Sequence, residues 1–261
     1  MRVLHINRYH YIAALLGVLL VLATSLIATA ASDVNAFVRI EGSTAFHSVL
    51  QASQPVQIKS FWLQQHPVTN AEYLVFVKAH PQWRRDNVAA VFAGHGYLAH
   101  WQSSTETGPG ASAQHPVTQV SWFAAQAYCE SIDARLPTWY EWELVAAASE
   151  TAKDARNDAA WRQRILDWYA KPGNTALDNV MQNPANNYGV HDMHGLIWEW
   201  VLDFNSLIDS TQTQNLCGGG ALTLQQKENF AILMHVAMLS SLHGSDTTRT
   251  LGFRCARDMS P

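Results

Sequence analysis

Helical periodicity is confined to four short segments of this chain, and the stretches between them carry no internal repeat. Residues 81–119 hold Gly, Pro, His and Trp in no regular order, and the chain after residue 170 is rich in Asn and Gly. Short apolar runs in that last part, AILMHVAML (231–239) and LGFRCAR (251–257), predict brief strands. Few helices, short strands and long irregular connections together predict one α+β domain with many loops.

The four periodic segments also carry helix start signals. Two of them begin with a Thr-x-x-Glu pattern, in which the threonine and the glutamate side chains satisfy two backbone N–H groups reciprocally. In chain order, the first three helices are predicted to begin at Thr69 (with Glu72), at Ser121 and at Thr138 (with Glu141). The fourth is predicted to span Asp158 to Ala170. Residues 33–60 alternate weakly between apolar and polar and predict short strands.

The N-terminus has the pattern of an export signal. Arg2 and Arg8 precede the apolar run Ile12 to Ala30, which ends in the small residues Ala28-Thr29-Ala30. This pattern predicts a secretory signal peptide over residues 1–31. A single N-terminal membrane anchor is the alternative, because the 19 residues 12–30 can just cross a bilayer. Either way residues 33–261 form an exported domain, periplasmic or secreted, which touches a membrane only through that segment if it is retained.

Composition narrows the function classes further. Hydrophobic residues make up 48% of the 261 residues, which excludes a disordered chain. The 17 basic residues are outnumbered by 21 acidic ones and form no basic block, so binding to nucleic acid is not expected. The three cysteines allow at most one disulfide. Cys217–Cys255 is the predicted pair, because Cys129 falls on the apolar side of the helix after Ser121.

Four segments in this order resemble one known family. They are HPVTNAEYLVFV (66–77), HPVTQVSWFAAQAYCESIDARLPTWYEWELVAAA (115–148), NNYGVHDMHGLIWEWVLD (186–203), and CGGG with LGFRCAR (217–220 and 251–257). Together they resemble the formylglycine-generating enzyme family, also called sulfatase-modifying factors, over residues 55–258. The resemblance implies a single C-type-lectin-like α+β domain with little regular secondary structure.

The resemblance also implies an activity, from which this chain departs. Family members oxidise a sulfatase cysteine to formylglycine with dioxygen, using two cysteines five apart that bind Cu(I) after a Gly-Gly-Ser segment. Soft thiolates suit Cu(I). Here Gly218-Gly219-Gly220 takes the place of that segment, and Thr223 and Glu228, or Leu224 and Asn229 in a shifted register, stand at the cysteine positions. Copper is therefore not expected, and whether the chain is an enzyme stays open.

A structural calcium ion is the metal that the resemblance does imply. The family's ligand positions fall on Asp192 and Glu199 through carboxylates and on Gly195 and Ile197 through main-chain carbonyls. A hard cation prefers such a mixture of oxygens. The alternative is that Asp192 caps a turn and Glu199 pairs with an arginine. A second calcium site cannot be placed, and Asn174 is the one candidate ligand for it.

The candidate catalytic residues are Cys217, Glu228 and His235, which would line a remodelled pocket; the alternative places the apolar stretch around His235 in a core strand. Three functions follow. The chain is a maturation factor for a protein or peptide-derived substrate with altered chemistry, a non-catalytic lectin-like module that binds a protein partner, or a true formylglycine-generating oxidase.

Overall fold

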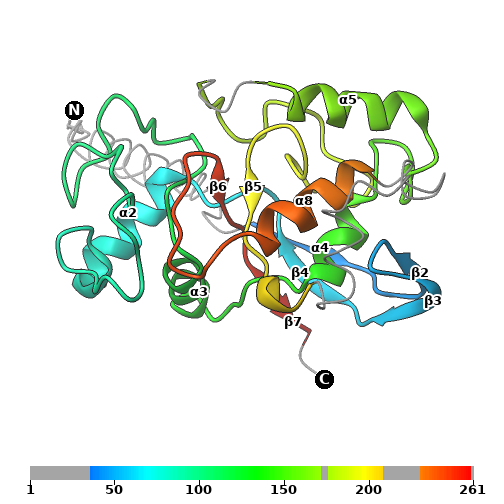
Figure 1. The fold of residues 1–261 in the computed structure, drawn as a ribbon, viewed down its shortest axis with the longest axis horizontal. Coiled ribbons are helices and arrows are strands. Elements are labelled where there is room, and N and C mark those ends of the chain that lie inside the picture. The colour runs from blue at the N-terminus through cyan, green and yellow to red at the C-terminus, as the bar shows by residue number, and fades with distance from the viewer. Residues whose placement is uncertain (1–35, 172–175, 208–229, 260–261) are drawn as a thin grey trace, which may run out of the picture. The chain divides into compact units, whose positions relative to one another are not determined.

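Strands from the two ends of the domain lie in one sheet. The computed structural model describes residues 36–171, 176–207 and 230–259, and those from Phe37 onward form one compact unit. In its main sheet, β4 (Phe61–Gln64) lies between β1 (Phe37–Ile40) and β7 (Ala256–Asp258) and is antiparallel to both. Leu63 of β4 faces Val38 on one side and Ala256 on the other, and it is fully buried. In Figure 1, β4 and β7 are drawn below α4 and α8.

Two smaller sheets complete the strand content of the described residues. The hairpin of β2 (Ser43–Ser48) and β3 (Gln51–Ile58) is antiparallel, whereas β5 (Trp198–Glu199) and β6 (Leu251–Gly252) are parallel. Gly252 is required where β6 passes the chain before α3, since a Cβ there would lie 2.3 Å from the carbonyl oxygen of Val117. Because β6 pairs with β5, this close approach also holds β5 inside the domain.

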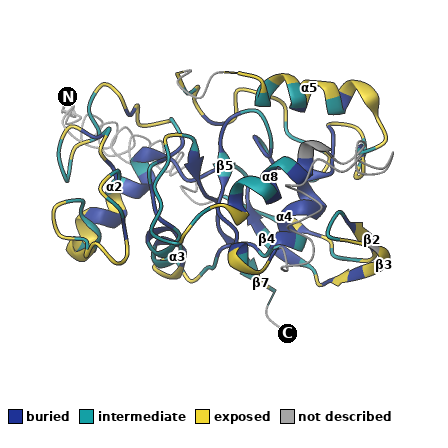
Figure 2. Cartoon of the chain, viewed as in Figure 1, coloured by how far each residue is buried: buried dark blue, intermediate teal, exposed yellow. Residues whose placement is uncertain are grey.

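The predicted helix starts are confirmed. Both capping boxes form, at Thr69 and at Thr138, and the side chains of Ser121 and Asp158 cap the other two helices. The helices are α2 (Asn70–Ala79), α3 (Trp122–Glu130), α4 (Trp139–Ala146) and α5 (Ala159–Tyr169), with short 3-10 turns η1 (Pro81–Trp83) and η2 (Phe204–Ser206). Figure 2 shows α4 almost wholly buried, whereas α5 lies at the surface with one exposed face.

The strand predicted for residues 231–239 is wrong, because this segment is helix α8 (Phe230–Ser240). Its buried residues Ile232, Leu233, Val236 and Leu239 recur at helical spacing. The run is apolar at nearly every position, so the sequence alone could not separate a buried helix from a buried strand.

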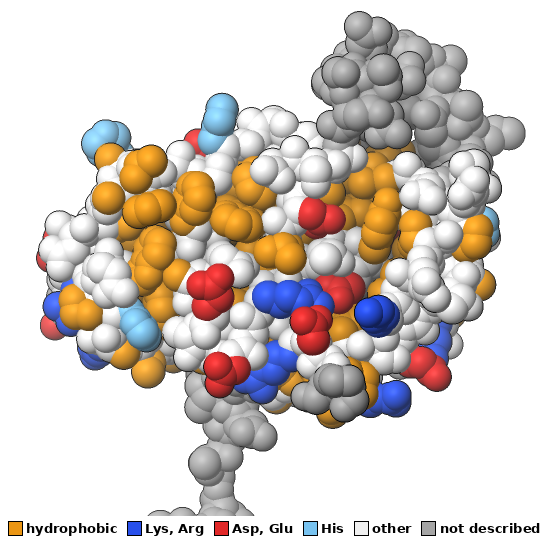
Figure 3. All heavy atoms as spheres, turned by 90° about the horizontal axis from the view of Figure 1, so that it is seen from below, with side chains coloured by type: hydrophobic (Ala, Val, Ile, Leu, Met, Phe, Trp, Pro, Cys, Tyr) orange, Lys and Arg blue, Asp and Glu red, His pale blue; other side chains and the backbone are white. Residues whose placement is uncertain are grey.

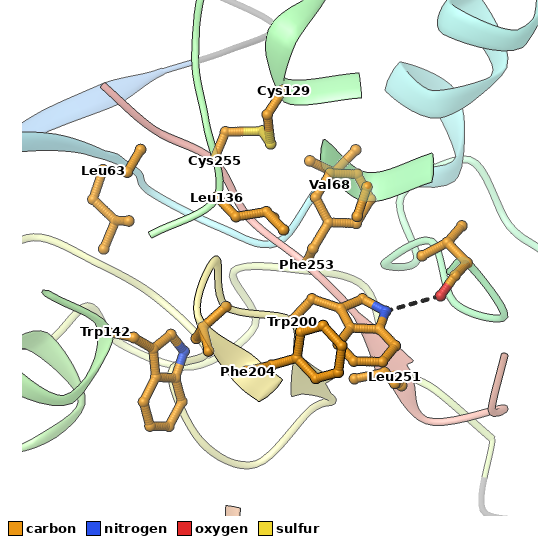
Figure 4. Packing of buried hydrophobic residues seen from close by; sticks show 14 of the residues in the cluster. Leu63, Val68, Cys129, Leu136, Trp142, Trp200, Phe204, Leu251, Phe253 and Cys255 are labelled. Carbon is orange, nitrogen blue, oxygen red and sulfur yellow. Dashed lines mark hydrogen bonds between the residues drawn. A yellow bond between two sulfur atoms is a disulfide. The ribbon is translucent and has the colours of Figure 1, made fainter. Parts of the chain in front are cut away.

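The core is rich in aromatic side chains and contains a disulfide. Trp139, Trp142 and Trp200 are among the largest fully buried side chains. The predicted Cys217–Cys255 pair is wrong: Cys129 of α3 and Cys255 form the bridge, with Cα atoms 5.6 Å apart (Figure 4). The apolar side of α3 faces the segment that leads into β7, so burial of Cys129 places it against its partner.

The hairpin of β2 and β3 is tied to α4 by a buried carboxylate. Glu143 of α4 is fully buried and accepts hydrogen bonds from the Ser48 hydroxyl and, at 2.7 Å, from the Val49 N–H. Burial raises the pKa of Glu143 to about 7. The guanidinium of Arg156 lies 3.6 Å away and opposes that rise.

The surface carries both signs of charge. On the face that Figure 3 shows, acidic and basic side chains lie next to one another and hydrophobic side chains surround them. Within the described ranges, no helix has the length and apolar content needed to cross a bilayer. The predicted signal or anchor over residues 1–31 falls outside those ranges. The α+β fold class with a single loop-rich domain is confirmed.

Candidate functional site

A buried ion pair lies at the centre of the predicted site. Glu199 of β5 and Arg254 are both fully buried, and two guanidinium nitrogens of Arg254 donate to the two carboxylate oxygens at 2.7 and 2.8 Å. The indole N–H of Trp142 donates to the same carboxylate at 2.9 Å. Arg254 also donates to the carbonyl oxygens of Gln64 and His191. The pair therefore joins β5, the end of β4 and the 191–195 loop to the C-terminal segment.

Two histidines contact the ring of Trp142, His235 fully buried and His194 half-buried. His235 of α8 contacts the Trp142 ring with centroids 4.2 Å apart, and its Nε2 lies 2.9 Å from the Glu199 carbonyl oxygen. His194 contacts the same indole at 5.7 Å, and its Nε2 lies 2.8 Å from the Ala146 carbonyl oxygen. Burial lowers the pKa of His235 to about 3 and that of His194 to about 4. Both rings are therefore neutral at ordinary pH, and His235 is packed in the core and is not an exposed base.

The carboxylates of two predicted calcium ligands, Asp192 and Glu199, already have partners within the chain. Asp192 and Gly195 line a cavity, whereas Ile197 and Glu199 are buried in the core. The Asp192 carboxylate accepts a hydrogen bond from the Met181 N–H at 2.6 Å, and the Glu199 carboxylate is neutralised by Arg254. Both oxygens of the Glu199 carboxylate are bonded to Arg254, so in this arrangement that carboxylate does not fit a calcium ligand. Calcium binding stays a prediction, to be tested by titration.

The largest cavity near these residues lies between α5 and the 191–195 loop. This α5 cavity, of about 530 Å³, has an apolar wall and a charged rim. Trp161 and Ile165 form part of the wall, and Arg164 and Glu150 form a two-bonded ion pair at the rim, with both N–O distances 3.0 Å. Asp192 and Gly195 also line the cavity, so two predicted site residues face a space large enough for a ligand.

A smaller cavity of about 250 Å³ has an aromatic wall. In this tryptophan cavity, the ring of Tyr169 stacks on Trp198 with centroids 4.7 Å apart and planes 8° apart, and Trp168 lies beside both. The Tyr169 hydroxyl is buried and has no hydrogen-bond partner within the described part of the chain. Burial raises the pKa of that phenol, so it stays a hydrogen-bond donor.

A third space, of about 460 Å³, is the histidine cavity, lined by His100, His115 and Arg249 among others. The three cavities adjoin one another. The α5 and tryptophan cavities share Trp168, Lys171 and Gly195, and the tryptophan and histidine cavities share Ala176 and Leu177.

The sequence motifs did not predict these cavity walls. The signal was the stripe of Trp161, Ile165, Trp168 and Tyr169, which carries more aromatic surface than a helix at the rim of a small domain needs to bury.

The segments that build these walls match a known domain. Residues 23–259 match the model of the sulfatase-modifying factor enzyme 1-like domain, which is nearly the whole chain. The chain belongs to this family. The formylglycine-generating enzyme of Mycobacterium tuberculosis is 26% identical over 83% of this chain and 94% of its own length. That of Streptomyces coelicolor is 27% identical over 84% of this chain and 82% of its own.

Two further proteins that are similar to this chain are not formylglycine-generating enzymes by name. Hercynine oxygenase of Mycobacterium tuberculosis is 29% identical over 56% of this chain and 38% of its own length. The solved structure of CarF superimposes with a TM-score of 0.52 at 15% identity, covering 87% of this chain and 99% of CarF, which shows a shared fold. Sulfatase-modifying-factor relatives therefore include proteins named for different reactions.

The copper site that the family resemblance implies does not fit this member. The chain has three cysteines, and Cys129 and Cys255 are bonded to each other. Only Cys217 is left with a thiol, so one chain cannot supply the two thiolates that Cu(I) would need. Cys217 and Glu228, the other candidate catalytic residues, lie outside the described residues, as does Asn174.

Proposed function

We propose that this chain is an exported maturation factor that acts on a protein or on a peptide-derived molecule without a copper–thiolate pair. The observation that carries the proposal is the row of three adjoining cavities. Together they offer an aromatic wall, a phenol without a hydrogen-bond partner among the described residues, and charged side chains, a mixture that suits a ligand with both apolar and polar groups. A ligand longer than one cavity could extend from the tryptophan cavity into either neighbour.

Export is part of the proposal and has two supports. Arg2 and Arg8 precede an apolar run that ends in small residues, as in a signal peptide. The Cys129–Cys255 bridge suits an oxidising compartment. The intact mass of the protein recovered from the periplasm or the medium tests this, since cleavage after Ala31 removes 31 residues and retention removes none.

A non-catalytic binding module is the second candidate, and the state of His235 favours it. The ring is buried, neutral and hydrogen-bonded to main chain, so the one candidate catalytic residue that the structure describes is not placed to act as a general base. A module would use the same cavities but would leave its ligand chemically unchanged.

The two candidates are separated by the mass of an exported product. Exported fractions of a strain lacking the gene are compared after complementation with the wild type, Tyr169→Phe or Cys217→Ala. A maturation factor gives a product with a changed mass that is lost or reduced in Tyr169→Phe. Tyr140→Phe is the matched control, because Tyr140 lies on α4 away from the three cavities. No mass change with the wild type contradicts catalysis.

The formylglycine reaction is tested separately. The purified protein is incubated with Cu(I), dioxygen and a sulfatase-derived cysteine peptide, and the aldehyde is trapped with a hydrazide. We expect no aldehyde, because one free thiol replaces the pair. Aldehyde formation by the wild type that is abolished in Cys217→Ala would overturn the proposal of altered chemistry.

A further inference from the structure

The histidine cavity is lined by basic groups and by no acidic ones. Arg249, His100 and His115 contribute to its wall, and the other described residues that line it are neutral. Arg249 makes no hydrogen bond or ion pair with any part of the chain that the structure describes. Most other arginines near the domain centre are paired, as Arg254 is with Glu199. An unpaired guanidinium at a cavity rim is free to bind an external anion.

His100 adds a second observation inside the same wall. Its Nδ1 is buried and has no hydrogen-bond partner among the described residues. Burial lowers the pKa of His100, and the positive charges of Arg249 and Arg85 lower it further, while a hydrogen bond with Gln119 opposes them. The His100 ring therefore experiences the charge of two arginines that no carboxylate in the cavity wall offsets.

The wall of this cavity is held in place by main-chain hydrogen bonds. The Leu98 N–H donates to the Gln119 carbonyl oxygen at 3.0 Å, and the Gln119 N–H donates to the Thr248 carbonyl oxygen at 3.0 Å. Gln119 thus connects the turn before His100 to the segment that carries Arg249, and it does so with a φ of 56°. These bonds hold together the backbone segments that carry His100 and Arg249 before any ligand arrives.

The opposite side of the cavity is fixed by Asn70. Its N–H donates to the His115 carbonyl oxygen at 2.9 Å, and its side-chain oxygen accepts from the Trp101 indole N–H at 2.9 Å. The backbone of His115 is therefore anchored, while its half-buried side chain has no hydrogen-bond partner among the described residues. Two histidines and one arginine are left to bind a ligand.

From this combination we infer that the histidine cavity is an oxyanion-binding site, which takes the carboxylate or the phosphate group of a small molecule or of a chain end. Arg249 provides the charge and two donors on one side, and His115 and His100 provide ring nitrogens within the wall. The cavity volume of about 460 Å³ accommodates the group together with the part of the molecule that carries it. The inference does not rest on the maturation-factor proposal, since anion binding requires no reaction.

The test is a titration of the purified chain with inorganic phosphate and, separately, with acetate, followed by calorimetry or by amide NMR shifts. Sodium chloride keeps the ionic strength constant, so that nonspecific screening does not contribute. We expect saturable binding of at least one of the two anions. Binding of phosphate alone identifies a phosphate site, binding of acetate alone a carboxylate site, and binding of both a general oxyanion site.

Three variants locate the binding. Arg249→Gln is expected to weaken the affinity at least tenfold and His115→Gln severalfold, whereas Arg249→Lys retains part of it. Arg39→Gln is the matched control, because Arg39 of β1 is also exposed and unpaired within the described residues but lies outside the cavity wall. It removes the same charge and should change the affinity less than twofold. Absence of saturable binding by the wild type, or equal affinity of Arg249→Gln and the wild type, overturns the inference.

Discussion

Removal of the Cys129–Cys255 bridge should cost a large part of the stability of this domain. The bridge closes a loop of 126 residues. The chain-entropy relation gives about 5 kcal/mol for a loop of that length, and native disulfides of small domains are typically worth ~2–5 kcal/mol. The whole free energy of unfolding of a domain is only about 5–15 kcal/mol. The double variant Cys129→Ala/Cys255→Ala should therefore unfold at much lower urea concentration than the oxidised wild type.

The assay has two readouts that depend on the pairing. Urea denaturation followed by circular dichroism gives the loss in free energy, and a thiol reagent in denaturant without reductant counts free thiols. The wild type should show one free thiol, since three cysteines include one bridged pair. Cys217→Ala should show none and should keep its midpoint. If instead Cys217→Ala exposes two thiols and loses several kcal/mol, the bridge involves Cys217 and the reasoning is refuted.

Three further predictions concern buried charges. Glu199→Gln or Arg254→Met should each destabilise the domain by about 3–5 kcal/mol in urea denaturation, because each leaves a buried partner unpaired; a loss below 1 kcal/mol would contradict this. The pKa of Glu143 is raised from 4.5 to about 7, so the folded state holds a proton that the unfolded state lacks between these pH values. The contribution of Glu143 to the free energy of unfolding is therefore present below about pH 4.5, and roughly 3 kcal/mol of it is lost as the pH rises to 7. The difference in free energy of unfolding between Glu143→Gln and the wild type should grow over that range. If Arg254 neutralises Glu199 as the structure shows, EDTA should move the melting temperature by less than about 1 °C, whereas a melting temperature that rises with free calcium would support the site at Asp192 and Glu199.

Local sequence signals predicted the helices, whereas the disulfide pairing depends on long-range packing. Thr69 and Thr138 identified two helix starts because a capping box lies within four residues of sequence. The pairing of Cys129 with Cys255 depends instead on how α3 packs against a segment 126 residues away. Spacing within the sequence carries no information on that contact.

The candidate site was likewise predicted only in part from the sequence. The sequence left two roles open for Glu199, a calcium ligand or the partner of an arginine, and the structure shows the pair with an arginine. It could not identify Arg254 as that arginine, because the two residues are 55 positions apart and meet only in the folded domain. The tryptophan cavity was missed since Trp198 and Tyr169 stack only after α5 has packed beside β5.

The position of β7 has a consequence for how the protein is made. This strand completes the sheet that begins with β1, and the segment just before it carries Arg254 and Cys255. The main sheet and the buried ion pair therefore cannot close until residues 254–258 have left the ribosome. Loss of these residues, through a stop codon before them or through trimming, should be as damaging as a deletion in the middle of the core.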